Sequence, residues 1–227
     1  MWQTTDDYKI YKVLSKGCNA FLINKDDLYI LFDCGPINTL NTLKKNLNKV
    51  LNGHKLDFLF FSHGHYDHVE SANKVKEYFN CKIISTKNLV NYLKKGYGPL
   101  YSPNWRILKS NKIFNHFKNK ETYEPINVDI VLKENQLSEL CNMDIEVINT
   151  PGHCKYHNSL IINKEIALSG SIIYGSYPYV PPFVSDSEIV LSSWEKLLKT
   201  NCSIFLPAHK RELNRKTLLK YYNKYNK

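Results

Sequence analysis

The chain has 227 residues, of which 43% are hydrophobic, and it carries a formal net charge of +10 at pH 7. This apolar content is enough for a substantial buried core, so we expect a folded globular protein. The first residues lack the basic and apolar regions of a secretory signal, and the apolar runs are far shorter than the roughly 20 residues of a membrane helix. We therefore predict a soluble, cytoplasmic protein without a membrane partner.

The positive charge raises the question of nucleic-acid binding, because clustered Lys and Arg residues neutralise phosphates. Lysines are spread over most of the chain, however, and this favours a solvated basic surface over a nucleic-acid partner. The charge is concentrated only in the C-terminal tail, where apolar residues at helical spacing predict a docked terminal helix. The six cysteines include no Cys-x-x-Cys pair, so we expect reduced thiols that mostly fill the core.

The N-terminal half begins with predicted strands and then alternates with helices. Strands at residues 8–13, 19–24 and 28–33 predict an antiparallel start. Apolar residues at helical spacing then predict a helix from residue 39 to residue 51. The elements that follow are a strand at 56–61, a helix at 69–79, a strand at 82–85 and a helix at 88–95. Because strands alternate with helices here, we expect a segment of parallel sheet.

The C-terminal half repeats this pattern more loosely. Its predicted elements are strands at 128–132, 145–149, 159–162, 166–169 and 203–206, a helix at 187–199 and the tail helix. Between the halves, residues 96–127 are rich in aromatic residues, Pro and Asn and are too long for an ordinary connection. We expect this insertion to act as a substrate lid. No linker divides the chain, so we predict a single domain over residues 1–227.

The stretch after the predicted strand at 56–61 reads Ser-His-Gly-His-Tyr-Asp-His. Residues two apart in an extended segment point to the same side, so His63 and His65 can converge on one point. Asp67 and His68 follow as the chain turns into a helix. Imidazole and carboxylate ligands together favour zinc as the bound metal ion, with iron or manganese as alternatives. A lone histidine is usually structural, but this spacing after a buried strand is specific for a metal site.

This stretch resembles the signature of the metallo-β-lactamase superfamily, and the resemblance extends over nearly the whole chain. Residues 31–35 are similar to the early strand end that carries an aspartate. Residues 150–153 and 206–209 are similar to the two segments that supply the later histidines. The resemblance implies an α/β fold, an αββα sandwich in which two mixed β-sheets are flanked by helices, with metals at one edge of the sheets.

Carried over residue by residue, the resemblance implies two metal sites and one or two zinc ions. The ligands would be His63, His65 and His153 for the first ion, and Asp67, His68 and His209 for the second. Both later histidines directly follow predicted strands, where ligands can gather in loops.

Three neighbours of these ligands have less direct roles. Asp33 is expected to orient a metal-binding histidine through a hydrogen bond rather than to bind metal. His157 lies near His153 in the sequence and is a candidate to face the pocket. Cys154 is a substitute ligand or a reactive thiol in one interpretation, but a packing role is the preferred one.

One position departs from the family pattern. Many members have Ser-Gly-Asp, with a carboxylate that bridges the metals, where this chain has Ser-Gly-Ser ending at Ser171. Serine is a poor ligand unless it is deprotonated, so we expect one tightly bound ion or two of unequal affinity. The missing carboxylate also counts against the mononuclear iron sulfur dioxygenases of the family.

These features predict a zinc-dependent hydrolase acting on a small molecule with an ester, lactone, thioester or amide bond. Asp67 is the predicted catalytic residue, because it can orient the nucleophile and carry a proton. Ser171 and Tyr174 are the predicted substrate-binding residues, although Tyr174 is equally suited to packing. Two alternatives stay open: a phosphodiesterase acting on a nucleotide or nucleic acid, and an iron-dependent redox enzyme of the same fold.

Overall fold

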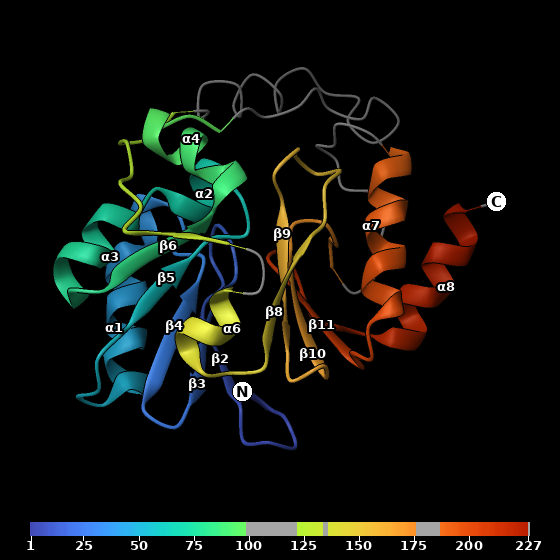
Figure 1. The fold of residues 1–227 in the computed structure, drawn as a ribbon, viewed down its shortest axis with the longest axis horizontal. Coiled ribbons are helices and arrows are strands. Elements are labelled where there is room, and N and C mark those ends of the chain that lie inside the picture. The colour runs from blue at the N-terminus through green and yellow to red at the C-terminus, as the bar shows by residue number, and fades with distance from the viewer. Residues whose placement is uncertain (99–121, 134–135, 176–186, 227) are drawn as a thin grey trace. The chain divides into compact units, whose positions relative to one another are not determined.

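The computed structural model describes residues 1–98, 122–133, 136–175 and 187–226 (Figure 1). The chain folds as two compact units, Met1–Gly98 with Thr122–Met143, and a second unit that includes Asp144–Lys227. Most of the predicted insertion at residues 96–127 lies outside the described residues. Its role as a lid and the organisation of the chain as a single domain stay predictions.

The first unit contains a seven-stranded mixed sheet with the strands in sequence order. Its strands are β1 (Trp2–Gln3), β2 (Lys9–Leu14), β3 (Ala20–Lys25), β4 (Leu28–Phe32), β5 (Phe58–Phe60), β6 (Lys82–Thr86) and β7 (Ile130–Leu132). β1 to β4 pair antiparallel, and β4 to β7 pair in parallel. The predicted antiparallel start and parallel segment are both confirmed.

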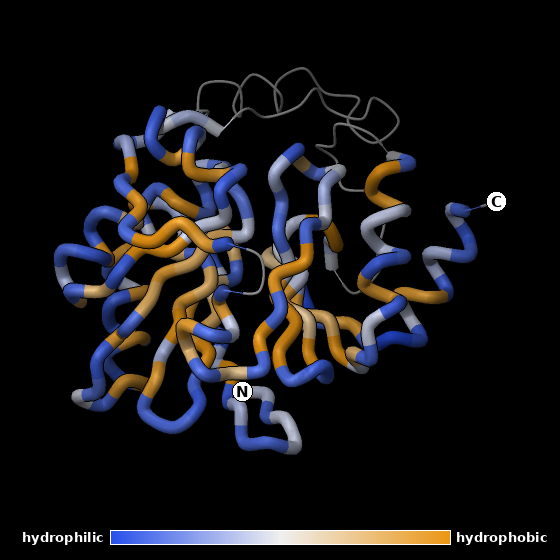
Figure 2. The backbone as a smooth tube through the Cα atoms, in the orientation of Figure 1, coloured by the Kyte–Doolittle hydropathy of each residue, from blue (hydrophilic) through white to orange (hydrophobic). Residues whose placement is uncertain are grey.

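Helices cover one face of this sheet. They include α1 (Leu40–Leu51), α3 (Ala72–Phe79) and α4 (Lys87–Lys95). The unit also has shorter helical elements, η1 (Ile37–Thr39), α2 (Tyr66–Val69) and α6 (Gln136–Cys141). Leu43 and Leu47 of α1 are buried in one apolar cluster with Leu31 and Leu59 of the sheet. Leu31 and Leu59 are paired in register on neighbouring strands, so their side chains point to the same face of the sheet, where α1 packs. Figure 2 shows the matching pattern of apolar strands and hydrophilic loops.

The predicted helix at 69–79 corresponds to α3, which begins three residues later, at Ala72, and the short helix α2 precedes it. The Glu70 N–H still donates to the Tyr66 carbonyl of α2, but the Ser71 N–H bonds to a distant loop. The Glu70 carboxylate accepts the backbone N–H of Ile37 at 2.9 Å, and the Ser71 N–H donates to the Gly35 carbonyl at 3.2 Å. These bonds attach α2 to the residues that follow β4.

The second unit contains a five-stranded mixed sheet in the order β12-β11-β10-β9-β8. Its strands are β8 (Ile145–Asn149), β9 (Asn158–Ile162), β10 (Ile166–Gly170), β11 (Ile204–Pro207) and β12 (Leu213–Asn214), and its helices are α7 (Ser187–Lys199) and α8 (Arg215–Tyr225). β10 and β11 pair in parallel and the other neighbours antiparallel. Trp194 of α7 is fully buried in the core of this unit and donates its indole N–H to the Ile172 carbonyl at 2.7 Å. Two mixed sheets with flanking helices confirm the predicted α/β class.

The C-terminal tail forms a helix as predicted, but this helix begins later than the charge pattern indicates. Leu213 pairs with Phe205 of β11 and so belongs to a strand. The Asn214 side chain then caps α8 by accepting the N–H of Thr217 at 2.9 Å, which is a common way to begin a helix. Leu218 is the buried residue of α8 and packs into the core of the unit.

All six cysteines are free and buried, which confirms the expectation of core thiols. Among the helices of the described residues, none has both the length and the apolar composition needed to cross a membrane.

Arg215 joins the start of α8 to the end of α7. Its guanidinium donates to the carbonyls of Thr200 at 2.7 Å, of Cys202 at 3.3 Å and of Leu198. The last carbonyls of a helix have no partner within the helix and carry partial negative charge, so a cation is stabilising there.

We expect Arg215→Met to lower the free energy of unfolding by about 1.5–3 kcal/mol, because charged hydrogen bonds to buried carbonyls are lost. Urea unfolding measures this difference. The matched control is Lys216→Met at the exposed neighbouring position, for which we expect a change within about 0.5 kcal/mol. Equal destabilisation by the two variants would show that Arg215 does not cap α7.

Candidate metal centre

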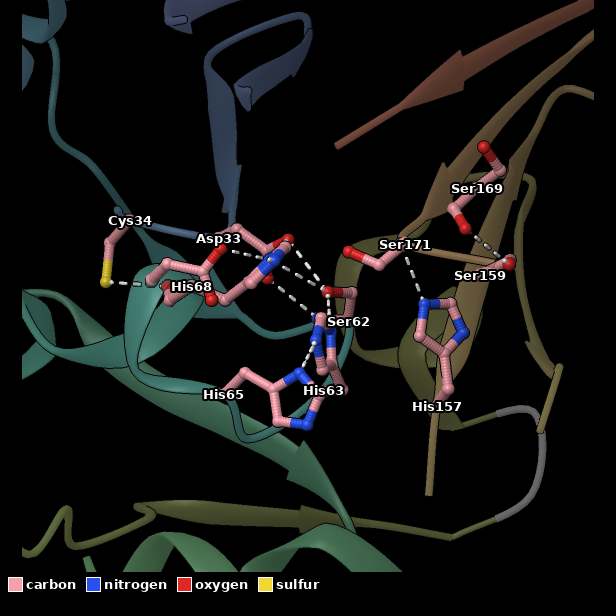
Figure 3. A network of polar contacts seen from close by, with 11 residues as sticks. Asp33, Cys34, Ser62, His63, His65, His68, His157, Ser159, Ser169 and Ser171 are labelled. Atoms are coloured by element: carbon pink, nitrogen blue, oxygen red, sulfur yellow. Dashed lines mark hydrogen bonds and ion pairs between the residues drawn. The ribbon is translucent and has the colours of Figure 1, made fainter. Parts of the chain in front are cut away.

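His63 and His65 lie in the loop between β5 and α2 and are brought together there. His63 Nε2 is 2.9 Å from His65 Nδ1, and the ring centroids are 4.4 Å apart (Figure 3). Both side chains are buried. The alternation of an extended backbone thus places two ring nitrogens at one point, as the sequence indicates.

A buried carboxylate organises this loop. Asp33, directly after β4, is fully buried and adopts a left-handed φ of 63°. Its Oδ1 accepts the Ser62 N–H at 2.8 Å, and its Oδ2 accepts the Ser62 hydroxyl at 2.8 Å and lies 2.8 Å from His68 Nδ1. The expectation that Asp33 orients a histidine is confirmed.

These contacts fix where the protons lie. The Ser62 hydroxyl has one hydrogen, which it donates to Asp33, so its oxygen is the acceptor in the 2.8 Å contact with His63 Nδ1. His63 therefore carries its proton on Nδ1 and keeps the Nε2 lone pair. His68 likewise donates from Nδ1 to Asp33 and keeps its Nε2 lone pair. One carboxylate thus orients two histidines, and Ser62 is a contributor to which the sequence analysis assigned no role.

Asp67 and His68 form a second pair of candidate ligands. Asp67 Oδ2 lies 3.6 Å from His68 Nε2, and the Asp67 side chain is 21% exposed. Burial has the largest single influence on His68 and lowers its pKa, but the Asp67 and Asp33 carboxylates together raise the pKa above its ordinary value. A metal ion that binds His68 therefore competes with a stabilised proton.

Neighbouring residues pack closely against the loop that carries His63 and His65. A Cβ atom added to Gly64 would lie 3.3 Å from a methyl carbon of Leu89 and 3.3 Å from the Tyr123 hydroxyl. A Cβ atom added to Gly98 would lie 1.8 Å from the Gly64 carbonyl oxygen, which no side chain can tolerate. Gly98 is therefore needed for the backbone to approach this closely, whereas a side chain at Gly64 would require Leu89 and Tyr123 to shift slightly.

The donors in this loop fit a divalent metal ion. Two nitrogens that each lie roughly 2.05 Å from a tetrahedral zinc ion are about 3.3 Å apart. The separation of 2.9 Å between His63 Nε2 and His65 Nδ1 is near that value. The protonated Nδ1 of His63 points away from His65, as expected for a ligand that is held by a hydrogen bond on its other nitrogen.

The other two predicted ligands belong to the second unit. His153 follows β8 and is buried, and His209 follows β11 and is partly exposed, so both lie in loops after strands as predicted. The ring of Tyr174 lies against that of His209, with centroids 5.3 Å apart and an interplanar angle of 32°. This predicted substrate residue therefore adjoins a predicted ligand. The first unit carries four of the six predicted ligands and the second carries two.

α7 holds the segment that carries His153. The Ser193 hydroxyl donates to the Pro151 carbonyl at 2.6 Å. Gly152 has a φ of 128°, and a Cβ atom there would come within 2.8 Å of the backbone nitrogen of Val190. Only glycine allows this close approach of the segment to the helix.

His157 and Ser171 are bonded to each other rather than left exposed. The Ser171 N–H donates to His157 Nε2 at 3.0 Å, and both residues are buried. His157 Nδ1 lies 2.9 Å from Thr150 Oγ1, so both of its ring nitrogens have partners. Ser171 is only 1% exposed, and its assignment to substrate binding stays a prediction.

Cys154 is a free, buried thiol. Burial raises the pKa of its thiol to about 12, so it stays protonated at neutral pH. A thiolate is the form that binds metals and reacts with oxidants. The packing role of Cys154 stays the preferred prediction.

The Asp33 contacts predict the effect of a single atom change. In Asp33→Asn the amide N–H₂ opposes the donors of Ser62 and His68, so His68 is expected to move its proton to Nε2, the nitrogen that would bind metal. We expect zinc affinity to fall about 10–100-fold in a calorimetric titration.

Two variants complete this comparison. Ser62→Ala removes the hydroxyl that links His63 to Asp33 but keeps the direct contact between Asp33 and His68, so it should weaken binding of the first ion more than binding of the second. Asp27→Asn, at a carboxylate whose side chain is 89% exposed, is the matched control and should leave zinc affinity unchanged. Wild-type affinity in Asp33→Asn would contradict the orienting role.

Comparison with known proteins identifies the family of this chain. Residues 15–209 match the metallo-β-lactamase superfamily. A probable metallo-hydrolase of Methanocaldococcus jannaschii is 32% identical over 154 residues, which cover 64% of this chain and 62% of that protein. This match therefore spans less than two thirds of the relative.

Solved structures share the fold. A metallo-β-lactamase from Cronobacter sakazakii superposes with a TM-score of 0.65 at 16% identity, covering 88% of this chain and 74% of that one. An archaeal metallo-β-lactamase superfamily protein from Sulfolobus tokodaii has a TM-score of 0.62 at 14% identity, covering 96% of this chain and 85% of that one. The family match and the shared fold, together with the histidine loop, show that the chain belongs to the metallo-β-lactamase superfamily.

Proposed function

We propose that the protein is a zinc-dependent hydrolase of a small molecule with an ester, lactone, thioester or amide bond. The observation that carries the proposal is the pair of ring nitrogens of His63 and His65, 2.9 Å apart at the end of a buried strand. A superfamily relative described as a probable metallo-hydrolase supports the reaction class.

The proposal assigns one metal ion to each of two groups of side chains. These are His63, His65 and His153 for the first ion, and Asp67, His68 and His209 for the second. Neutral imidazoles and a single carboxylate suit zinc better than the harder magnesium or calcium ions. A bound zinc ion would lower the pKa of a coordinated water to roughly 7 and would polarise a carbonyl oxygen.

The side chains around these groups have distinct tasks in the proposal. Asp33 keeps the Nε2 lone pairs of His63 and His68 available, directly or through Ser62. Asp67 is partly exposed, so it can orient the attacking water and carry a proton between water and leaving group. Tyr174 beside His209, together with Ser171, is proposed to contact the substrate.

Loss of a ligand tests this function. We expect His65→Ala and Asp67→Ala to lower kcat/KM at least about 100-fold on any substrate found among esters, lactones, thioesters and amides, because general acid–base groups and ligands contribute that much or more. Elemental analysis should find zinc in the wild-type protein and less zinc in His65→Ala. The matched control is His54→Ala at an exposed histidine paired with Asp27. Unchanged turnover in both ligand variants would refute the mechanism.

A second candidate function, phosphodiester hydrolysis, can be distinguished from hydrolysis of esters, lactones, thioesters and amides by inhibition and by salt dependence. The net charge of +10 favours a phosphodiesterase, since basic residues attract phosphates. That activity would be inhibited by RNA and would fall steeply with salt, whereas hydrolysis of a neutral ester would not. Iron in the purified protein together with oxygen-dependent turnover would instead indicate a redox enzyme.

The proposal includes a reducing, cytoplasmic environment and a small molecule as the partner. All six thiols are free and buried, and disulfides are rare in proteins of that compartment.

Ser171 replaces a bridging carboxylate of the family, and this predicts unequal metal affinities. We expect Ser171→Asp to tighten binding of the more weakly held zinc ion by about tenfold or more, because it restores a negative charge between two cations. Ser171→Asn has the same size without the charge and is the control. Calorimetric zinc titrations of the three proteins measure the effect, and equal affinities in the Asp and Asn variants would contradict it.

A further inference from the structure

His157 is a buried histidine whose two ring nitrogens both take part in hydrogen bonds. Its Nε2 lies 3.0 Å from the backbone nitrogen of Ser171, and its Nδ1 lies 2.9 Å from the Thr150 hydroxyl (Figure 3). The His157 backbone carbonyl also accepts the Thr150 N–H at 2.9 Å. His157 thus contacts both the residue that follows β8 and the residue that follows β10.

The proton positions in this network follow from its two ends. A backbone N–H can only donate, so His157 Nε2 must present its lone pair to Ser171. A neutral imidazole then carries its proton on Nδ1 and donates it to Thr150 Oγ1.

At the other end, the Ser159 hydroxyl donates to the Ser169 carbonyl at 3.4 Å, because a carbonyl can only accept. The Ser159 oxygen is therefore the acceptor in its 2.8 Å contact with the Thr150 hydroxyl. Every hydrogen between Ser171 and Ser169 points in one direction along the network. The opposite tautomer of His157 would place its N–H against the Ser171 N–H and leave two buried donors without acceptors, which is costly.

We propose that His157 is a positioning residue, fixed as the neutral Nδ1–H tautomer, that holds the strand ends carrying His153 and Ser171 in the arrangement that binds metal. This inference rests on the proposed function. His157 acts through its neighbours, because the Nε2 lone pair that a metal or a proton would need is already bonded to the Ser171 N–H.

The position of the network explains why it bears on the metal site. Thr150 begins the segment that ends at His153, and α7 holds the opposite side of that segment through Ser193. His157 supplies the bond from the strand side, so the segment is fixed between the sheet and the helix. Ser171 is the residue that stands in place of the bridging carboxylate, and its backbone is fixed by the same ring.

The tautomer is tested first on the wild-type protein. Long-range proton–nitrogen NMR of protein with ¹⁵N-labelled histidines should show one imidazole protonated on Nδ1, both without metal and with zinc added. The resonance is assigned by its loss in His157→Gln. A proton on Nε2, or a zinc-dependent shift of a ring nitrogen of His157 typical of coordination, would overturn the inference. The metal-free spectrum does not depend on the proposed function.

The positioning role is tested with a graded series of variants. His157→Leu removes both ring bonds, whereas His157→Gln keeps a side-chain oxygen that can accept the Ser171 N–H. We expect zinc affinity to fall about 10–100-fold in the Leu variant and to be partly restored in the Gln variant. The visible spectrum of bound cobalt(II) should change in the same order. His54→Gln, at an exposed position, should match the wild type.

The outcomes separate the two proposals. A wild-type protein that binds neither zinc nor cobalt refutes the proposed function, while the NMR result still decides the tautomer. A wild-type protein that binds metal, with equal affinity and spectrum in the Leu variant, overturns the positioning role of His157. If the Leu variant does not fold, the comparison of His157→Gln with the wild type decides: an unchanged cobalt spectrum and unchanged zinc affinity count against the inference.

Discussion

The buried carboxylate of Asp33 is the interaction on which the first half of the candidate site depends. An isolated carboxylate in a protein interior costs several kcal/mol, and it is tolerated only where donors satisfy it. Asp33 has three such contacts within 2.8 Å, from the Ser62 N–H, the Ser62 hydroxyl and His68. These donors come from the end of β5 and from α2. The need to satisfy one charge therefore fixes the loop that carries the histidines.

In the second unit, hydrogen bonds between uncharged groups fix the segment that carries a candidate ligand. Its network of neutral groups runs from the Ser171 N–H through His157 and Thr150 to Ser159 and the Ser169 carbonyl. Each group has a unique donor or acceptor role because the ends are backbone atoms. In both units the polar residues that support the candidate ligands lie where strands end, so the sheets define the positions and the hydrogen bonds define the ring orientations.

Much of this was predictable from the sequence, for physical reasons that can be named. Strands and helices with a clear apolar period, such as α1 and β5, lie where the pattern indicates. The approach of His63 to His65 follows from the two-residue period of an extended chain. Short elements such as α6 and β12 carry too few residues to show a period, and they were missed.

The partners of polar side chains were harder to predict. At the break between α2 and α3, the Ser71 N–H bonds to the Gly35 carbonyl, more than 30 residues away, and no local pattern indicates this partner. The role of His157 likewise depends on Ser171, across two strands. The sequence did contain a signal for Ser62, a hydroxyl directly before the histidine stretch, and for His157, a histidine directly before the fully buried strand β9. Neither signal identifies the partner without the fold.

A crystal structure of the zinc-loaded protein, with anomalous diffraction measured at the zinc edge, tests the central claim most directly. The Asp33 network predicts that the first zinc ion is bound by Nε2 of His63 and the second by Nε2 of His68. The His63–His65 contact predicts that Nδ1 of His65 also binds the first ion. Zinc bound to Nδ1 of His63 or His68, or found away from these three side chains, would contradict it.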